Sequence, residues 1–152
     1  MSDEMLQGTW HVVASSLGMW QRRSEPSITY APLPDGRISD TVLSRGRGGW
    51  STIVGIDERQ PDGSLVWRGL QPLTLLVRSR WRVLLHDEPL AAIRFERTPF
   101  TEAGIDILAR DAGAAPEAVA EIARRLAADP SAASFVPRLR PPKGRGGTVA
   151  PG

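Results

Sequence analysis

The sequence predicts an all-β protein, an eight-stranded antiparallel up-and-down β-barrel with one C-terminal α-helix packed on the barrel. Three observations lead to this prediction. Eight short segments between residues 8 and 110 have the composition of strands, and turn sequences separate them with no helical pattern in between. Eight such strands can close on themselves, which removes the exposed edges of a sheet. After residue 110 the apolar residues recur with the period of a single helix.

The predicted strands follow one another through short connections such as PLPDG and ERQPDGS. They read GTWHVVASS, SITYA, RISDTVLSR, WSTIVGID, LVWRGL, TLLVRSRWRVLLH, LAAIRFERT and GIDILAR. The sixth has the clearest period of two, because Arg78, Arg80 and Arg82 alternate with a second set of residues. That second set is Val77, Ser79, Trp81, Val83 and Leu85. We expect it to face the interior of the barrel.

The helix is predicted to begin at Pro116. Proline and the following Glu117 suit a first helical turn, where no backbone donor is needed and a carboxylate complements the helix dipole. One apolar stripe follows at helical spacing, formed by Val119, Ile122, Ala123 and Leu126. Asp129-Pro130 ends it. We therefore expect one domain over residues 1–140 and a disordered, basic, Pro/Gly-rich tail over residues 141–152.

The composition limits the classes of function. The formal net charge is +2, but four cations lie in the last fifteen residues and the remainder carries −2. These four are Arg138, Arg140, Lys143 and Arg145. A nearly neutral body argues against a nucleic-acid partner, and the short RGRGG and KGRGG segments do not change this. There is no cysteine, which excludes disulfides and thiolate metal sites.

The chain has no run of apolar residues that approaches the ~18 needed to span a membrane. Its first residues, MSDEMLQG, lack the charged, apolar and small-residue order of a secretion signal, so we expect a cytoplasmic protein. No phosphate loop, dinucleotide fingerprint or nucleophile elbow is present, and we expect no cofactor. His86-Asp87-Glu88 lacks the spacing of a metal site, because adjacent residues at a turn cannot all face one ion.

Two ends of the chain resemble the lipocalin family. GTWHVVAS resembles the Gly-x-Trp start of a lipocalin, and DILARDAGAAPEAVAEIARRLAADPSAASFVPRLRP is similar to the ending of bacterial lipocalins. PLPDGRISD adds to the resemblance, which covers roughly residues 6–140. It implies a calyx with the C-terminal helix against its side. It also implies that Trp10 lies across the closed end with Arg110 packed over it, while Gly8 allows a tight turn beneath.

Aromatic residues are the candidates for a ligand-binding wall. The predicted set is Trp20, Tyr30, Trp50, Trp67, Trp81 and Phe95. Rings of this kind can line a pocket, and Gly55 and Gly69 would leave room on their strands. The alternative is a core filled by these side chains. The segment SLGMWQRR, with Met19 and Trp20, is either a lid over the open end or a surface loop anchored by one tryptophan.

Asp40 and Tyr30 are the speculative catalytic candidates. Asp40 is in register with Ile38, Val42 and Ser44, so an inward orientation would bring a carboxylate into an apolar barrel and raise its pKa. We favour the other register, in which Asp40 faces solvent near the PDG turn. His11 is expected to face outward under the C-terminal helix.

The leading functional hypothesis is a binding protein that holds a small hydrophobic ligand in its calyx. Tyr30, Asp40 or an arginine near the rim, such as Arg68, would orient the ligand. The second hypothesis is a cyclase or isomerase that folds a hydrophobic substrate inside the same pocket. A third is a filled barrel that binds protein partners through its outer face. The sequence does not indicate the ligand or the oligomeric state.

Overall fold

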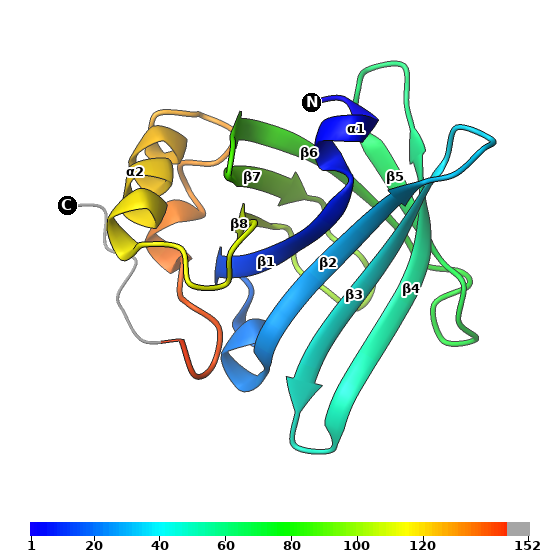
Figure 1. The fold of residues 1–152 in the computed structure, drawn as a ribbon, viewed down its shortest axis with the longest axis horizontal. Helices are drawn as coiled ribbons and strands as arrows, with labels where there is room; N and C mark the ends of the chain where they lie inside the picture. Colours follow the sequence, from blue (N-terminus) through cyan, green and yellow to red (C-terminus); the bar gives the residue numbers. More distant parts are fainter. Residues whose placement is uncertain (146–152) are drawn as a thin grey trace.

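The computed structural model describes residues 1–145, and its strands form one closed barrel in the chain order β1 to β8 (Figure 1). The strands are β1 (Gly8–Ser15), β2 (Ser24–Pro32), β3 (Ile38–Gly46), β4 (Gly49–Arg59), β5 (Leu65–Gly69), β6 (Arg78–Asp87), β7 (Leu90–Phe95) and β8 (Gly104–Ala109). Each pairs antiparallel with the next, and β8 closes the barrel by pairing with β1. The predicted eight-stranded up-and-down barrel is therefore confirmed.

Four short helical elements accompany the barrel. They are α1 (Asp3–Leu6), the 3-10 turn η1 (Gly18–Arg22), α2 (Pro116–Ala127) and the 3-10 turn η2 (Val136–Arg138). The helix α2 begins at the predicted proline, and all four residues of its predicted apolar stripe are buried. It lies against the outer side of the barrel, as Figure 1 shows. The sequence did not predict α1, whose single turn is capped by the Ser2 hydroxyl accepting from the Met5 amide.

The two ends of the barrel differ because the strands run up and down. The connections 33–37, 60–64 and 88–89 lie at one end together with α1, which covers it. The connections 16–23, 47–48, 70–77 and 96–103 lie at the other end. We call the first the closed end and the second the mouth.

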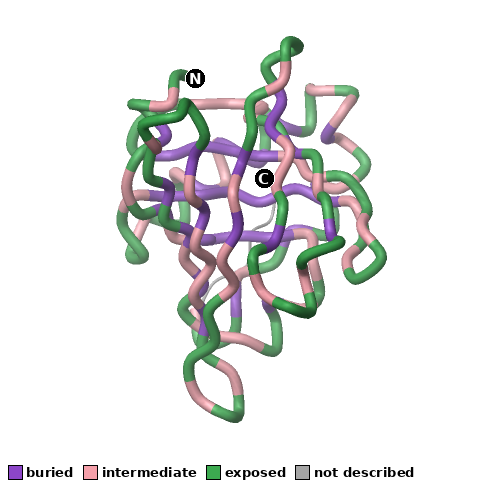
Figure 2. The backbone as a smooth tube through the Cα atoms, turned by 90° about the vertical axis from the view of Figure 1, so that its right-hand side faces the viewer, coloured by how far each residue is buried: buried purple, intermediate pink, exposed green. Residues whose placement is uncertain are grey.

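Two clusters of buried side chains stabilise this arrangement. One lies inside the barrel and is built around Trp10, Tyr30 and Trp81. The other lies between α2 and the outer faces of β1, β7 and β8, and includes Ile105 and Ile107. Figure 2 shows that the buried backbone runs through the strands, while the loops are exposed. All six residues of β8 are buried because this strand is covered on both faces.

Two predictions about local structure are wrong. Leu85 does not share the inward face of Trp81, because a β-bulge between Val83 and Leu85 shifts the register and turns Leu85 toward the cluster under α2. Residues 74–77, which we placed in the sixth strand, form part of the preceding turn. The three arginines of this strand do face outward, with Arg78, Arg80 and Arg82 all exposed.

The start of the predicted tail is part of the folded body. The amide of Lys143 donates to the carbonyls of Trp20 and Arg23, both at 3.1 Å. His11 lies on the outer face next to this segment rather than under α2. The rest of the predicted tail, residues 146–152, lies outside the described residues. Within residues 1–145, no helix has the length and apolarity needed to cross a membrane.

Candidate functional site

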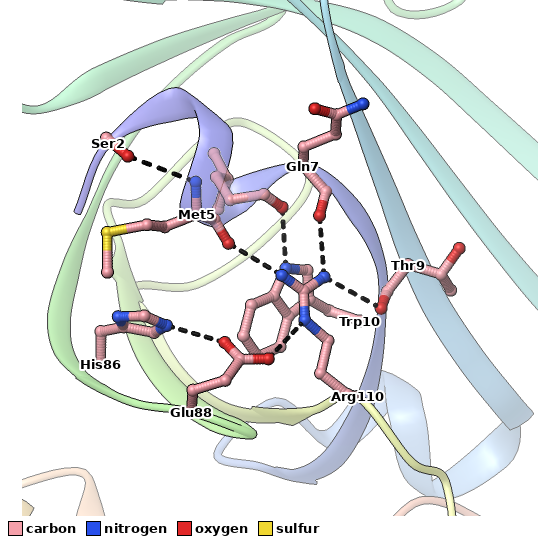
Figure 3. Close-up of polar contacts among 9 residues, drawn as sticks. Ser2, Met5, Gln7, Thr9, Trp10, His86, Glu88 and Arg110 are labelled. Carbon is pink, nitrogen blue, oxygen red and sulfur yellow. Dashed lines mark hydrogen bonds and ion pairs between the residues drawn. The ribbon is translucent and has the colours of Figure 1, made fainter.

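Trp10 and Arg110 seal the closed end of the barrel (Figure 3). The buried indole of Trp10 donates from Nε1 to the Leu6 carbonyl at 2.8 Å. The guanidinium carbon of Arg110 lies 3.7 Å from the centroid of the Trp10 ring, within the range of a cation–π contact. Its Nη2 donates to the carbonyl of Met5 at 2.8 Å and its Nη1 to that of Gln7 at 2.9 Å. The expected pairing is therefore present.

Gly8 gives this floor its tight entry into β1. Its φ is +100°, a left-handed conformation that side chains other than glycine rarely adopt. A Cβ atom at this position would also lie 3.2 Å from Nη1 of Arg110, which is shorter than most contacts that Cβ atoms make in proteins. Gly8 is therefore needed both for the turn and for the close approach of the guanidinium.

The turn at residues 86–88 supports the floor rather than a metal ion. Glu88 accepts from Nε of Arg110 at 2.9 Å and is bonded to Nε2 of His86 at 2.9 Å (Figure 3). Asp87 instead pairs with Arg125 of α2 at 2.6 Å. His86 and Glu88 thus bond to each other while Asp87 points to α2, so the three side chains do not converge, and no group of three His, Asp or Glu residues in the described chain could hold a metal ion.

A cavity of about 490 Å³ occupies the barrel between this floor and the mouth. Its wall consists of Leu17, Met19, Trp20, Ile28, Tyr30, Asp40, Val42, Ile53, Trp67, Leu73, Thr74, Val77, Ser79, Trp81, Ile93, Phe95, Thr98, Phe100, Thr101 and Asp106. Most of these side chains are aliphatic or aromatic. Leu73 and Phe100 belong to mouth loops and are 88% and 73% exposed, so apolar surface continues from the entrance into the interior.

Five of the six predicted aromatic residues line this cavity, and Trp50 does not. Trp50 lies at the start of β4 on the outer surface, and its side chain is 56% exposed. Arg68 also faces outward, where it is exposed beside Ile56 of the neighbouring strand. Trp20 lies in η1 at the mouth, and its buried indole N–H has no acceptor within residues 1–145. Of the two arrangements considered for SLGMWQRR, a lid and a surface loop anchored by one tryptophan, this placement favours the lid, because both Met19 and Trp20 line the cavity.

The two glycines that we expected to widen the cavity leave no empty space. A Cβ on Gly55 would lie 2.0 Å from Nε1 of Trp67, so the indole occupies the room that the glycine leaves. A Cβ on Gly69 would lie 2.1 Å from Oγ1 of Thr74. The side chains of Trp67 and Thr74 therefore occupy the space beside these two glycines, and the cavity is not larger there.

An aromatic pair forms the inner wall of the cavity. The rings of Tyr30 and Trp81 stack with their centroids 5.5 Å apart at an interplanar angle of 27°. Nε1 of Trp81 donates to Oδ1 of Asp57 at 2.8 Å. Burial, together with the negative charges of nearby carboxyls, raises the pKa of Tyr30 well above its usual value, so the phenol stays protonated.

Asp40 faces the interior, and our prediction that it faces solvent is wrong. It is only 6% exposed and lies directly opposite Tyr30 in the β2–β3 ladder. Burial and the neighbouring charge of Asp57 raise the pKa of Asp40 well above its usual value. Burial raises the pKa of Asp57 to about 6, although the hydrogen bond from Trp81 opposes this. Two buried carboxyls in contact favour a state in which they share one proton.

Oδ1 of Asp40 and Oδ2 of Asp57 are buried, and neither has a conventional donor among the described residues. A proton on Asp40 would serve both atoms, because it converts one acceptor into a donor toward the other carboxylate. We therefore assign Asp40 as the protonated member of the pair. This assignment explains how two carboxyls can be buried side by side although neither forms an ion pair within residues 1–145, where Arg59 acts on Asp57 only through its nearby charge.

Asp106 is a third buried carboxyl, on β8. It receives a short hydrogen bond from the Ser15 hydroxyl, whose oxygen in turn accepts from the Leu17 amide. Burial raises the pKa of Asp106 to about 7, against the opposing effect of the Ser15 hydrogen bond. Asp106 pairs with Ser15, the last residue of β1, and therefore lies toward the mouth. Tyr30 pairs with Gly8 and lies toward the floor.

Comparison with solved structures places this geometry in a known fold. A siderocalin, Ex-FABP, has a TM-score of 0.68 at 14% identity, covering 93% of this chain and 96% of that one. Lobster apocrustacyanin A1 has a TM-score of 0.70 at 13% identity over 94% and 79% of the two chains. The bovine lipocalin allergen Bos d 2 has a TM-score of 0.64 at 13% identity over 93% and 94%.

The chain has the lipocalin fold. No protein-family model and no curated protein sequence matches it, so the likeness is one of structure. In this lipocalin fold the floor formed by Trp10 and Arg110 and the helix α2 occupy the places that the sequence resemblance implied.

Sequence reasoning missed two carboxyls of the lipocalin calyx, Asp57 and Asp106. Asp57 was missed because we predicted that the face of its strand that carries Trp50 points into the barrel. Asp57 lies on the opposite face and was therefore expected to point to solvent. Asp106 was missed because it is enclosed in the apolar run Ile105–Leu108. The available signal was that α2 must cover one face of this strand, which leaves an intervening aspartate facing the interior.

Proposed function

We propose that the protein binds a small hydrophobic molecule in its calyx. The observation that carries the proposal is the cavity of about 490 Å³, walled mainly by aliphatic and aromatic side chains and continuous with an apolar entrance. Its volume lies within the roughly 300–1,000 Å³ typical of sites for small molecules. Solved structures with the same fold include an odorant binding protein, at 9% identity and a TM-score of 0.66, and this supports the proposal.

The gain in free energy would come mainly from desolvation. A ligand that buries about 300 Å² of apolar surface gains about 7 kcal/mol from removal of that surface from water. Part of this gain is offset by the loss of translational and rotational freedom. Little further ordering of the barrel is needed, because the stacked pair Tyr30 and Trp81 is already in place.

The test is titration with N-phenyl-1-naphthylamine, an uncharged dye that fluoresces in apolar surroundings. The unmodified protein should enhance the dye's emission and lose tryptophan emission in the same concentration range. Val42→Trp fills the cavity from β3 and should weaken binding at least about tenfold. Thr41→Trp is the matched control, because it places the same indole on the outward side of the same strand and should leave binding unchanged.

Absence of any enhancement with the unmodified protein would contradict the proposal. Equal binding by Val42→Trp and Thr41→Trp would contradict the calyx as its location. Circular dichroism of both variants checks that the barrel is intact.

A second candidate function is isomerisation or cyclisation of a hydrophobic substrate. The observation that favours it is the Asp40–Asp57 pair, which holds one proton inside an apolar cavity opposite Tyr30. Asp40, which lines the cavity, would deliver its proton to one substrate atom and then, as a carboxylate, accept a proton from another, while Asp57 behind it stabilises the protonated form of Asp40. The product is then an isomer, and the pair ends with the same total of one proton.

Two substitutions distinguish catalysis from binding alone. Asp40→Asn and Tyr30→Phe should abolish conversion of a bound compound and leave its affinity within about threefold of the original. If chromatographic retention and NMR spectra, which distinguish isomers of equal mass, show every bound compound unchanged after prolonged incubation, the binding function stands and the catalytic candidate is rejected.

A further inference from the structure

We propose that the preferred ligand is a hydrophobic amine whose protonated nitrogen is bound by Asp106. This inference rests on the proposed function, because it specifies the chemistry of the molecule that the calyx holds. The ionisable residues of the cavity wall are all acidic. Among the described residues that line the cavity there is no lysine, arginine or histidine, whereas Asp40 and Asp106 are both present.

No cationic side chain among the described residues forms an ion pair with Asp40, Asp57 or Asp106. Asp57 lies next to Asp40, and the nearby charge of Arg59 lowers the pKa of Asp57, but the ion pair that Arg59 forms is with Asp3 at the surface. None of the three forms an ion pair within residues 1–145, although many surface carboxyls do. A buried charge without a counter-charge is costly, and a ligand that supplies the missing positive charge recovers part of that cost.

Asp106 is the carboxyl best placed to receive such a group. Asp40 already has Asp57 as its neighbour, but within residues 1–145 the one side-chain partner of Asp106 is the Ser15 hydroxyl, which occupies Oδ1. The Ser15 hydroxyl cannot give more, because its single proton is used and its oxygen accepts from the Leu17 amide. The remaining oxygen of Asp106 has no donor among the described residues, and Asp106 belongs to the cavity wall. This oxygen is therefore the available acceptor for a ligand.

The position of Asp106 also sets the direction of the ligand. Asp106 lies toward the mouth, while Tyr30 and its stacking partner Trp81 form the inner wall. An ammonium group at Asp106 would stay near the entrance, and the apolar chain would extend toward the aromatic pair. The charged end then remains close to water during entry, which lowers the cost of removing it from solvent.

The same arrangement selects against acids. A ligand carboxylate would meet Asp106 near the entrance and the Asp40–Asp57 pair deeper in the calyx, with no cation in the wall to offset the repulsion. An alcohol is tolerated, since its hydroxyl can donate one hydrogen bond, but it neutralises no charge. The expected order of affinity is therefore amine, then alcohol, then carboxylate.

The experiment compares decylamine, decan-1-ol and decanoate as displacers of N-phenyl-1-naphthylamine at pH 7.5. The three share one chain length, so differences in affinity report the head group. Decylamine should displace the dye at about tenfold lower concentration than decan-1-ol, and decanoate should need a concentration at least about tenfold higher. Asp106→Asn should reduce the preference for the amine over the alcohol to about twofold or less.

Asp62→Asn is the matched control, because it removes one negative charge from an exposed turn outside the cavity and should keep the full preference. An amine that binds no tighter than the alcohol, or an acid that binds as well as the alcohol, would overturn the inference while leaving the proposed function intact. Loss of the preference in Asp40→Asn but not in Asp106→Asn would overturn the assignment to Asp106. If neither decan-1-ol nor the dye binds, the proposed function itself fails.

Discussion

Substitution of Asp106 by asparagine should make the stability of the protein less dependent on pH. Burial raises the pKa of Asp106 in the folded state to about 7, whereas the ordinary value is 3.8. Between these two values the folded protein holds a proton on Asp106 that the unfolded chain has released. The free energy of unfolding must therefore fall as the pH rises through this interval, and it becomes constant with respect to this group above pH 7.

The size of the effect follows from the interval. Each pH unit within it changes the free energy of unfolding by about 1.4 kcal/mol for a single group. Since the slope declines as the pH approaches 7, raising the pH from 5 to 7 should cost the unmodified protein about 2 kcal/mol through Asp106 alone. A side-chain amide does not titrate in this range and can still accept the hydrogen bond from Ser15, so Asp106→Asn should not show this loss.

The assay is urea unfolding followed by tryptophan fluorescence at pH 5, 6, 7 and 8. The quantity of interest is the difference between variant and unmodified protein, because the titration of Asp40 and Asp57 is common to both and cancels. This difference should move in favour of the variant by about 2 kcal/mol between pH 5 and pH 7, and by less than about 0.5 kcal/mol more at pH 8. Parallel pH profiles for the two proteins would refute the argument that Asp106 is buried without a counter-charge.

Three further substitutions test the floor and the cavity wall. Arg110→Ala should lower the free energy of unfolding by about 2–4 kcal/mol, measured by urea unfolding, because it removes a cation–π contact and leaves backbone carbonyls without donors. Gly55→Ala should displace the Trp67 indole and weaken dye binding at least about threefold, since the new Cβ would lie 2.0 Å from that ring. Trp81→Phe removes the donor to Asp57 and should cost about 1–3 kcal/mol at pH 7 and less at pH 5, where Asp57 is protonated; an equal loss at both pH values would contradict this.

The features that the sequence predicted well are those with a local signature. The strand segments were recognisable from turn sequences and alternation, and α2 from its four-residue apolar stripe. The floor depends on three residue types, and the resemblance carried by Gly8, Trp10 and Arg110 was sufficient to pair two side chains that are 100 positions apart. Each of these inferences needed only the order of residues along one segment or one family pattern.

The orientation of β4 could not be predicted in the same way. Its outward face carries Trp50, Val54 and Ile56, whereas its inward face carries Ile53, Gly55 and Asp57, so the more apolar face is the one that points to solvent. At Gly55 the inward face is covered by the Trp67 indole from the neighbouring strand instead of by a side chain of β4. The alternation of apolar and polar residues along β4 does not show that a side chain from the neighbouring strand will cover its glycine.

Asp40 was misplaced for a related reason. Both faces of its strand contain one or two aliphatic residues and several polar ones, so composition does not decide which face is buried. The deciding factor is a second carboxyl on the next strand, which allows the pair to share a proton. Pairing of this kind depends on the register between β3 and β4 and becomes visible only in the folded barrel.

The short helix at the start of the chain has a consequence for the barrel as a container. The carbonyls of Met5, Leu6 and Gln7 accept hydrogen bonds from Trp10 and Arg110, so the first turn of the chain covers the closed end of the barrel. A chain that began at Gly8 would leave these donors facing water and the lower rim uncovered. The cover of the closed end would then be reduced to the Trp10 indole and the Arg110 guanidinium, which would retain the ligand less well.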